Sequence, residues 1–329
     1  MTYTISQVRD WNASLRSRRS KLVALFVGGT SGIGKHAAIK LANAVDQPTI
    51  YLVGRNEEAG ARIVEELKAG NPNGSYCFMP TDASRLPDVD ALCQKLQTRE
   101  KSLDLLFLSA GAIAFSKQET EAGIDVNHIL RYYSRMRFVH NLVPLLEAAE
   151  EPRVISVLAG GKEVTIEEDN LDLRKRFSLS ASNGYPATMT SLAFEVLASQ
   201  HPSISFIHEF PGIVATPILK KSLGGVLGTI LSLLIRPISI SEEESGEWHV
   251  FLSTSPSFPA KGSASADVAA EQDIKITQAS TGEAGGGVYI LNYNGQDVTN
   301  KTLMTQLRER GFPDIVWKHT LDTFDRILA

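Results

Sequence analysis

A glycine-rich stretch near the N-terminus is the first group of residues whose spacing indicates chemistry. Gly28, Gly32 and Gly34 form the pattern G-x-x-x-G-x-G directly after the apolar run 22–27. Glycines let the backbone turn sharply and approach a pyrophosphate, and the N-terminus of a following helix presents free N–H groups to the anion. Because this loop stands between a predicted strand and a predicted helix, it predicts a nucleotide-binding site.

Two charged residues further along the chain predict how the adenosine half of a dinucleotide would be held. Arg55 follows the apolar run 49–53, at a place where a carboxylate would bind the ribose hydroxyls and an arginine suits a 2′-phosphate. This favours NADP(H) over NAD(H), and the alternative is a solvated loop arginine. Asp82 follows the third predicted strand, where its carboxylate is placed to bond the adenine amine.

Apolar runs that alternate with helical segments predict the elements that position these residues. Strands are expected at 22–27, 49–53, 75–79, 103–108, 153–158, 204–208 and 287–292, and helices at 31–43, 57–69, 88–99, 120–149, 188–199 and within 302–328. Strands separated by helices form a parallel sheet, and continuous apolar runs are typical of strands covered on both faces. We therefore predict an α/β fold, a Rossmann-type doubly wound parallel sheet of about seven strands. The chain is expected to form one domain over 1–329, with a core at about 20–295, a C-terminal lid at about 217–260 and a helical extension at about 299–329.

Composition excludes several classes of protein. The 329 residues are 43% hydrophobic with a net charge of −4, which is globular composition without the basic excess of a nucleic-acid binder. Two cysteines form no disulfide framework and the opening residues carry no secretory signal, so we expect a cytoplasmic protein. The seven histidines show no ligand spacing, and we expect no metal site.

One apolar segment, 223–235, is flanked by Lys220, Lys221 and Arg236. It is too short to span a membrane. We interpret it as a hydrophobic cover over a substrate pocket, and the alternative is a peripheral contact with a membrane interface.

The pattern as a whole resembles the short-chain dehydrogenase/reductase family. Its cofactor motif matches the glycine loop, its Asn-Ala-Gly turn matches Ser109-Ala110-Gly111, and its Pro-Gly…Thr segment, which holds the nicotinamide carboxamide, matches 211–216. The resemblance implies an NADP(H) site formed by Gly28, Thr30, Ser31, Gly32, Ile33, Gly34, Arg55, Asp82, Ala110, Gly111, Pro211, Gly212, Val214 and Thr216. The opening, the long loop after the fifth strand and the tail look most like fungal members associated with secondary metabolism.

The family's catalytic set of asparagine, serine, tyrosine and lysine is not reproduced at the matching positions. Leu158 and Ala159 stand where the serine is expected, and Tyr185 is followed four residues later by Met189 instead of lysine. A register shifted by one pairs Gly184 with Thr188, and no lysine occurs in 177–219. Without that cation a tyrosine keeps a pKa near 10 and is a poor acid or base at neutral pH.

The asparagine position has two candidates. Asn127 mimics the family's local sequence, but counting along the helix from Pro144 or Gly123 places Arg131 there. The candidate catalytic residues are therefore Arg131, which could stabilise an oxyanion, and Tyr185, with Lys162 and Glu163 as weaker loop candidates.

Three functions fit these residues. The first is an atypical biosynthetic reductase of a ketone or aldehyde on an apolar, polyketide- or terpenoid-like molecule, using NADP(H). The second is a non-redox cyclase, isomerase or dehydratase on the same scaffold, and the third is a non-catalytic nucleotide-binding partner protein. A homo-oligomer is compatible with all three.

Overall fold

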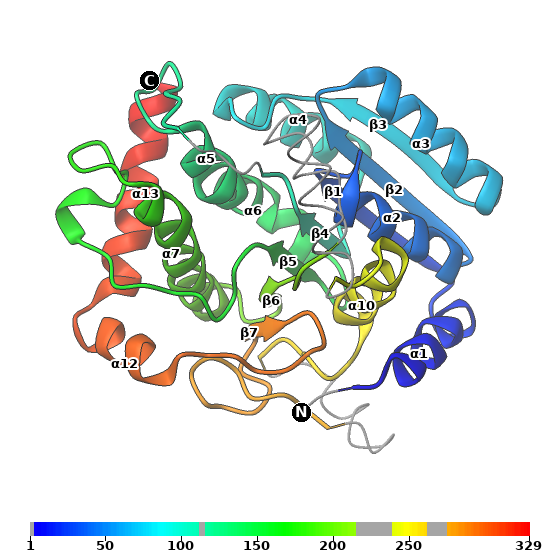
Figure 1. Ribbon diagram of the computed structural model, residues 1–329. Coiled ribbons are helices and arrows are strands. Elements are labelled where there is room, and N and C mark those ends of the chain that lie inside the picture. The colour runs from blue at the N-terminus through cyan, green and yellow to red at the C-terminus, as the bar shows by residue number, and fades with distance from the viewer. Residues whose placement is uncertain (1–2, 112–115, 215–238, 262–274) are drawn as a thin grey trace.

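The computed structural model describes residues 3–111, 116–214, 239–261 and 275–329 (Figure 1). Its strands form one parallel sheet in the order β3-β2-β1-β4-β5-β6-β7. They are β1 (Lys21–Val27), β2 (Gln47–Gly54), β3 (Ser75–Pro80), β4 (Leu105–Leu108), β5 (Arg153–Val157), β6 (Ser205–Phe210) and β7 (Val288–Asn292). The order reverses between β1 and β4, which is where doubly wound sheets bind their ligands.

Helices cover both faces of the sheet. On one face α2 (Gly32–Ala44) packs against α3 (Glu57–Gly70) and α10 (Glu242–Thr254), with α1 (Ile5–Arg18) on the outside of α10. The other face carries α4 (Leu86–Arg99), α6 (Ser134–Glu147), α7 (Leu179–Gln200) and α13 (Phe312–Leu328). The short elements are α5 (Val126–His128), the π-helical turn η1 (Ile129–Tyr133), the 3-10 turn η2 (Glu168–Asn170) and α12 (Lys301–Glu309).

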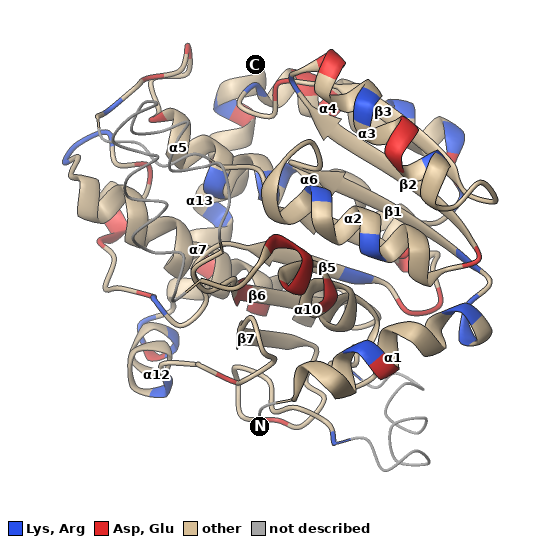
Figure 2. Ribbon diagram, turned by 45° about the vertical axis from the view of Figure 1, so that its right-hand side comes forward, with Lys and Arg blue, Asp and Glu red and all other residues tan. Residues whose placement is uncertain are grey.

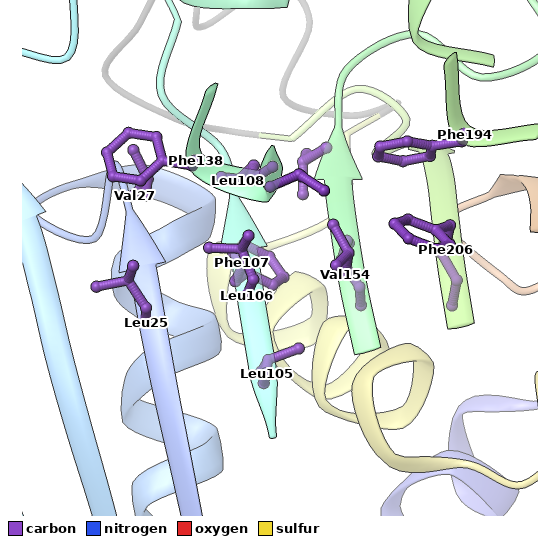
Figure 3. Packing of buried hydrophobic residues seen from close by; sticks show 14 of the residues in the cluster. Leu25, Val27, Leu105, Leu106, Phe107, Leu108, Phe138, Val154, Phe194 and Phe206 are labelled. Carbon is purple, nitrogen blue, oxygen red and sulfur yellow. The ribbon is translucent and has the colours of Figure 1, made fainter. Parts of the chain in front are cut away.

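The core consists of the two apolar faces of the central strands and the helices that cover them. Figure 3 shows the side chains of β1, β4, β5 and β6 in rows, with Phe138 of α6 and Phe194 of α7 above them. Every residue of β4 is buried, as is every residue of β5. Such uniformly buried strands are typical of a sheet covered on both faces.

The structure confirms the predicted fold and adds two helices to it. Neither α1 nor α10 was expected from the sequence. α10 supplies the crossover from β6 to β7, and its Gly246 lies so close to α2 that an added Cβ would be 2.9 Å from the carbonyl oxygen of His36. Residues 242–254 of the range expected as a lid therefore form a core helix. The predicted cover 223–235 lies outside the described residues.

The remaining boundaries differ by small amounts. The helix expected at 188–199 begins nine residues earlier, at Leu179. The helical stretch expected at 120–149 is divided into α5, η1 and α6 and begins at Val126. In the described ranges, no helix combines the length and the hydropathy needed to cross a membrane.

Candidate cofactor and substrate site

The glycine loop lies in close contact with the turn that follows β4. Gly28 has a φ of +95°, and a Cβ added there would be 2.6 Å from the backbone nitrogen of Ala110. A Cβ on Gly34 would be 2.5 Å from the Ser109 hydroxyl oxygen and 2.7 Å from the Gly28 carbonyl oxygen. Only glycine therefore fits either position without a shift of the backbone. The loop and the Ser109-Ala110-Gly111 turn form one continuous piece of backbone surface.

The N-terminus of α2 is open to an anion. Its first turn contains no acidic residue, although carboxylates there would stabilise a helix. By contrast, three glutamates occupy the first turn of α10 (Figure 2). Thr30 precedes α2 and packs on the end of β2, where a Cβ on Gly54 would be 2.8 Å from the Thr30 methyl carbon. The residues present thus fit the pyrophosphate of a dinucleotide, with its ribose directed toward the end of β2.

A pocket of about 570 Å³ opens beside the ends of β2 and β3. Arg55 and Asp82 both line it, together with Thr81 and with Asp88 and Lys95 of α4. The Arg55 side chain is exposed, and Asp82 Oδ1 accepts hydrogen bonds from the backbone and hydroxyl of Ser84 at 3.0 and 2.7 Å. The structure therefore brings together the two residues predicted to hold adenosine. Lys95 of α4 adds a second cation to the same pocket.

A buried arginine holds the turn after β4 against the end of β5. Arg135 of α6 donates from Nη2 to the Ala110 carbonyl at 2.8 Å and from Nη1 to the Val157 carbonyl at 2.8 Å. Nη1 also donates to the Ser156 hydroxyl at 2.7 Å, and Nε to the Leu130 carbonyl at 3.4 Å. Burial, and then the charge of Arg131, lower the pKa of Arg135 to about 9, so it remains charged at neutral pH. This side chain fixes the relative position of two strand ends at the site.

Arg131 lies one helical turn before Arg135, in the π-helical turn η1. The Ser134 N–H there bonds to the carbonyl of Ile129, five residues back, which widens the helix. Arg131 Nη1 donates to the Asn183 side-chain oxygen of α7 at 2.6 Å. Its Cγ would be 3.9 Å from a Cβ on Gly111, so the side chain borders the turn after β4. Burial lowers the pKa of Arg131.

Comparison with known proteins now decides the family. A family model for short chain dehydrogenases matches residues 22–168. The chain is 45% identical to oxidoreductase andH of Emericella variicolor, over 98% of this chain and 97% of that protein. It is also 30% identical to short-chain dehydrogenase/reductase SAT2 of Stachybotrys chartarum, over 94% and 93%. The chain belongs to the short-chain dehydrogenase/reductase family.

Membership of this family implies a nicotinamide dinucleotide cofactor, NAD(H) or NADP(H). Solved structures agree on the fold. The complex of Pseudomonas aeruginosa RhlG with NADP matches with a TM-score of 0.56 at 22% identity, over 74% of this chain and 93% of that one. Salutaridine reductase from Papaver somniferum matches with a TM-score of 0.56 at 19% identity, over 74% and 98%. The chain is thus a short-chain dehydrogenase/reductase related over its length to fungal oxidoreductases.

The segment expected to hold the nicotinamide carboxamide is described in part. Pro211 follows β6, and Gly212 has a φ of +70°, with a Cβ there only 2.9 Å from the ring of Tyr293. Val214 pairs with Ile240 in an isolated bridge. Thr216 lies outside the described residues, so its predicted contact remains a prediction.

Tyr185 does not share a described contact with Arg131. It lies in α7, and its hydroxyl accepts a hydrogen bond from the backbone N–H of Glu167 at 3.3 Å. Burial raises its pKa above the usual value. The residue of α7 that meets Arg131 is Asn183, which the sequence did not single out. The catalytic role of Tyr185 stays a prediction.

A chain of buried polar groups links β6 to α7, on the face of the sheet that α7 covers. The backbone N–H of Ala159 donates to Nε2 of His208 at 3.2 Å, so Nδ1 carries the proton and donates to the Ser191 hydroxyl at 2.7 Å. Ser191 donates in turn to Glu163 Oε1 at 2.8 Å. Burial, and then the charge of Arg135, lower the pKa of His208 to about 3. Glu163, a weaker candidate from the sequence, is therefore a buried structural group, and burial raises its pKa.

The sequence analysis missed Arg135 and Asn183. A signal for the first was present, since Arg131 and Arg135 have i,i+4 spacing in a predicted helix and therefore lie on one face. Two like charges at this spacing destabilise a helix unless other groups bind them. No pattern in the sequence pointed to Asn183, because its role depends on how α7 packs beside η1.

Proposed function

We infer that this protein is an NADP(H)-dependent oxidoreductase that reduces a carbonyl of an apolar small molecule in a fungal biosynthetic reaction. The observation that carries the proposal is Arg131, held by Asn183 beside Gly111 at the carboxyl ends of the strands. The family, the glycine cradle and the similarity to oxidoreductase andH support an oxidoreductase. The exposed Arg55 in the pocket beside Asp82 supports the 2′-phosphate of NADP(H).

The proposal includes a replaced catalytic set. Leu158 and Ala159 follow β5 without a side-chain hydroxyl, and Met189 stands four residues after Tyr185. Tyr185 has a raised pKa, which makes it a weaker acid than a free tyrosine. Among the described residues, the group placed to act on the carbonyl oxygen is the Arg131 guanidinium, a cation with five N–H donors.

Reduction of a carbonyl requires the protein to orient the cofactor and to stabilise charge on the carbonyl oxygen. A bound NADPH would supply the hydride for the carbonyl carbon. Arg131 stabilises the negative charge that develops on that oxygen, which takes its proton from water. Asn183 is a positioning residue, since its hydrogen bond at 2.6 Å fixes the guanidinium. The backbone from Gly28 to Gly34 and the Ala110-Gly111 turn hold the cofactor.

The non-redox alternative is favoured by the same missing hydroxyl and lysine. An arginine can stabilise an enolate in an isomerisation or cyclisation as well as an alkoxide in a reduction. The two kinds of reaction differ in what happens to the cofactor. NADPH is consumed in the reduction and is unchanged in the isomerisation or cyclisation.

Cofactor binding is the first test. We expect NADPH to bind at least tenfold more tightly than NADH, as measured by quenching of protein fluorescence. Arg55→Ala should remove that preference, whereas Arg62→Ala, an exposed arginine on α3, should keep it. Equal binding of the two cofactors by the unmodified protein would overturn the choice of NADP(H).

The reaction is tested by incubation with NADPH and a panel of apolar ketones and aldehydes, following absorbance and product mass together. Loss of NADPH absorbance with a product two mass units heavier supports reduction. A product of unchanged mass with no absorbance change supports the non-redox alternative. Binding of NADPH with neither change, and activity only when a second protein is added, supports the partner role.

A further inference from the structure

Arg131 makes fewer hydrogen bonds than three other buried or partly buried arginines. Arg137 faces Asp90 with two hydrogen bonds, and Arg308 faces Glu195 with two. Arg153 donates three hydrogen bonds to backbone carbonyls. Arg131 makes one, from Nη1 to Asn183, and no carboxylate lies within 4 Å of it among the described residues. In the described part of the structure, four of its five N–H donors are therefore without a protein partner.

The charge beneath Arg131 is also positive. Arg135 lies one turn along the helix, and the charge of Arg131 adds to burial in lowering the pKa of Arg135. Arg135 is neutralised by no carboxylate within the described residues, because its partners are three carbonyls and a hydroxyl. His208 of β6 is kept neutral chiefly by burial, which lowers its pKa, and Glu163 Oε1 lies 3.6 Å from its Nδ1. Two cations, Arg131 and Arg135, therefore lie beside the turn after β4.

One carboxylate, Asp125, partly offsets this charge from a distance. Its Oδ1 accepts from the backbone N–H groups of Asn127 and His128 at 3.1 and 3.3 Å, and its Oδ2 accepts from that of Gln118 at 3.0 Å. Ser182 adds a fourth hydrogen bond at 3.3 Å. These contacts fix Asp125 as the cap of α5, so it cannot turn to pair with Arg131. Arg131 therefore has no carboxylate partner within 4 Å among the described residues.

Arg131 is only partly buried, so its free N–H groups are open to a ligand, and a guanidinium binds an anion with charge-assisted hydrogen bonds. We propose that the substrate reaches this site as an anion, with an ionised oxygen next to the carbonyl that is reduced, as in a keto acid. The planar guanidinium of Arg131 presents parallel N–H groups that match two oxygens held side by side. One N–H meets the carboxylate oxygen and its neighbour meets the carbonyl oxygen. The proposal rests on the proposed function and specifies its substrate class.

The same charge has a consequence for the cofactor. The nicotinamide ring is neutral in NADPH and positive in NADP⁺, and the ring is expected beside Gly111, which Arg131 borders. Two nearby cations favour the neutral ring. The charge therefore favours NADPH, the form of the cofactor that the reduction of an anionic substrate requires.

The test uses a charged and an uncharged molecule of the same shape. The full-length protein, saturated with NADPH, is titrated by calorimetry at pH 7 and low salt with 2-naphthoate and with 2-naphthamide. We expect naphthoate to bind at least tenfold more tightly. Arg131→Met should remove the preference and change NADPH affinity less than threefold. Arg131→Lys should retain part of it, and Arg62→Met, a charge removed from the exposed surface of α3, should retain all of it.

Each other outcome has a meaning. Equal binding of the two probes, or binding of neither, overturns the anionic substrate while leaving the oxidoreductase proposal in place. Loss of NADPH together with naphthoate in Arg131→Met shows that Arg131 holds the cofactor, and also overturns the inference. Failure of the unmodified protein to bind NADPH contradicts the proposed function. If Arg131→Met does not fold, the ratio of the two probes in the unmodified protein and in Arg131→Lys still decides.

Discussion

Arg135 donates a hydrogen bond of 2.8 Å to the carbonyl oxygen of Ala110, so a buried side chain of α6 holds the backbone turn that faces the glycine loop. Its remaining bonds reach Ser156 and Val157 at the end of the next strand. The two strand ends that would flank a nicotinamide ring are thus fixed by one guanidinium and not by the sheet alone.

Replacement of Arg135 is expected to weaken both the fold and cofactor binding. Arg135→Met leaves the carbonyls of Ala110 and Val157 without this donor, and a buried acceptor left unsatisfied costs about 1–3 kcal/mol. We expect urea denaturation to show a loss of that size, and NADPH affinity to fall by about tenfold or more. Arg135→Lys should recover part of both. Unchanged NADPH affinity in a folded Arg135→Met variant would show that the turn holds its position without help.

Gly28 offers a test with a closely matched control. Gly28 and Gly282 have φ values of +95° and +92°, but a Cβ on Gly282 has nothing within 4 Å, whereas one on Gly28 meets Ala110. Both alanine variants should lose about 1–2 kcal/mol of stability from the left-handed backbone, and Gly28→Ala should lose more because its Cβ meets the backbone of Ala110. Only Gly28→Ala should also lose NADPH binding, by about tenfold or more. Equal cofactor affinity in the two variants would remove the glycine loop from the site.

Acid should destabilise the protein through His208. Its folded pKa of about 3 lies below the unfolded value of about 6.5, so the unfolded chain binds the extra proton first. Stability is therefore complete above pH 6.5 and falls by about 1.4 kcal/mol per pH unit below it. His128, whose pKa burial lowers to about 4, adds in the same direction. His249 has a raised pKa, because Glu209 outweighs the effect of burial, and it contributes stability that is lost only as the pH rises.

The measurement is the urea midpoint between pH 6.5 and 5.0. His208→Asn should lower stability at pH 7, since it loses the bond from Ala159, and should make the dependence on pH shallower by one proton. A slope identical to that of the unmodified protein would mean that His208 is charged in the fold.

Tyr185→Phe is expected to keep activity. The hydroxyl bonds to the backbone of Glu167 and burial raises its pKa, so its removal takes away one neutral hydrogen bond. We expect kcat/KM within about twofold and a stability loss of about 1 kcal/mol. A drop in kcat of tenfold or more, with NADPH affinity unchanged, would return Tyr185 to the mechanism.

The sequence predicted a parallel sheet of about seven strands and where those strands lie in the chain, because continuous apolar runs between helical segments leave few alternatives for a buried parallel strand. It did not predict α10, since the segment Glu242–Thr254 has an acidic first turn and mixed polarity, and its burial depends on contact with α2. The positions of Gly28 and Arg55 could be predicted because each follows directly after an apolar run that forms a strand. Asn183 was not, because the partner it meets is 52 residues away in the chain.

The attachment of α13 to η1 has a consequence for how the protein matures during synthesis. Tyr132 bonds to Thr320 at 2.6 Å across 188 residues of chain, and Tyr133 bonds to His319 at 2.8 Å. The turn that carries Arg131 is therefore held by a helix that is synthesised after all seven strands of the sheet. A nascent chain released at residue 300 could already pair its strands, yet Arg131 would lack the support that fixes it. The sheet can therefore form during translation before the site is complete, because the site also needs α13.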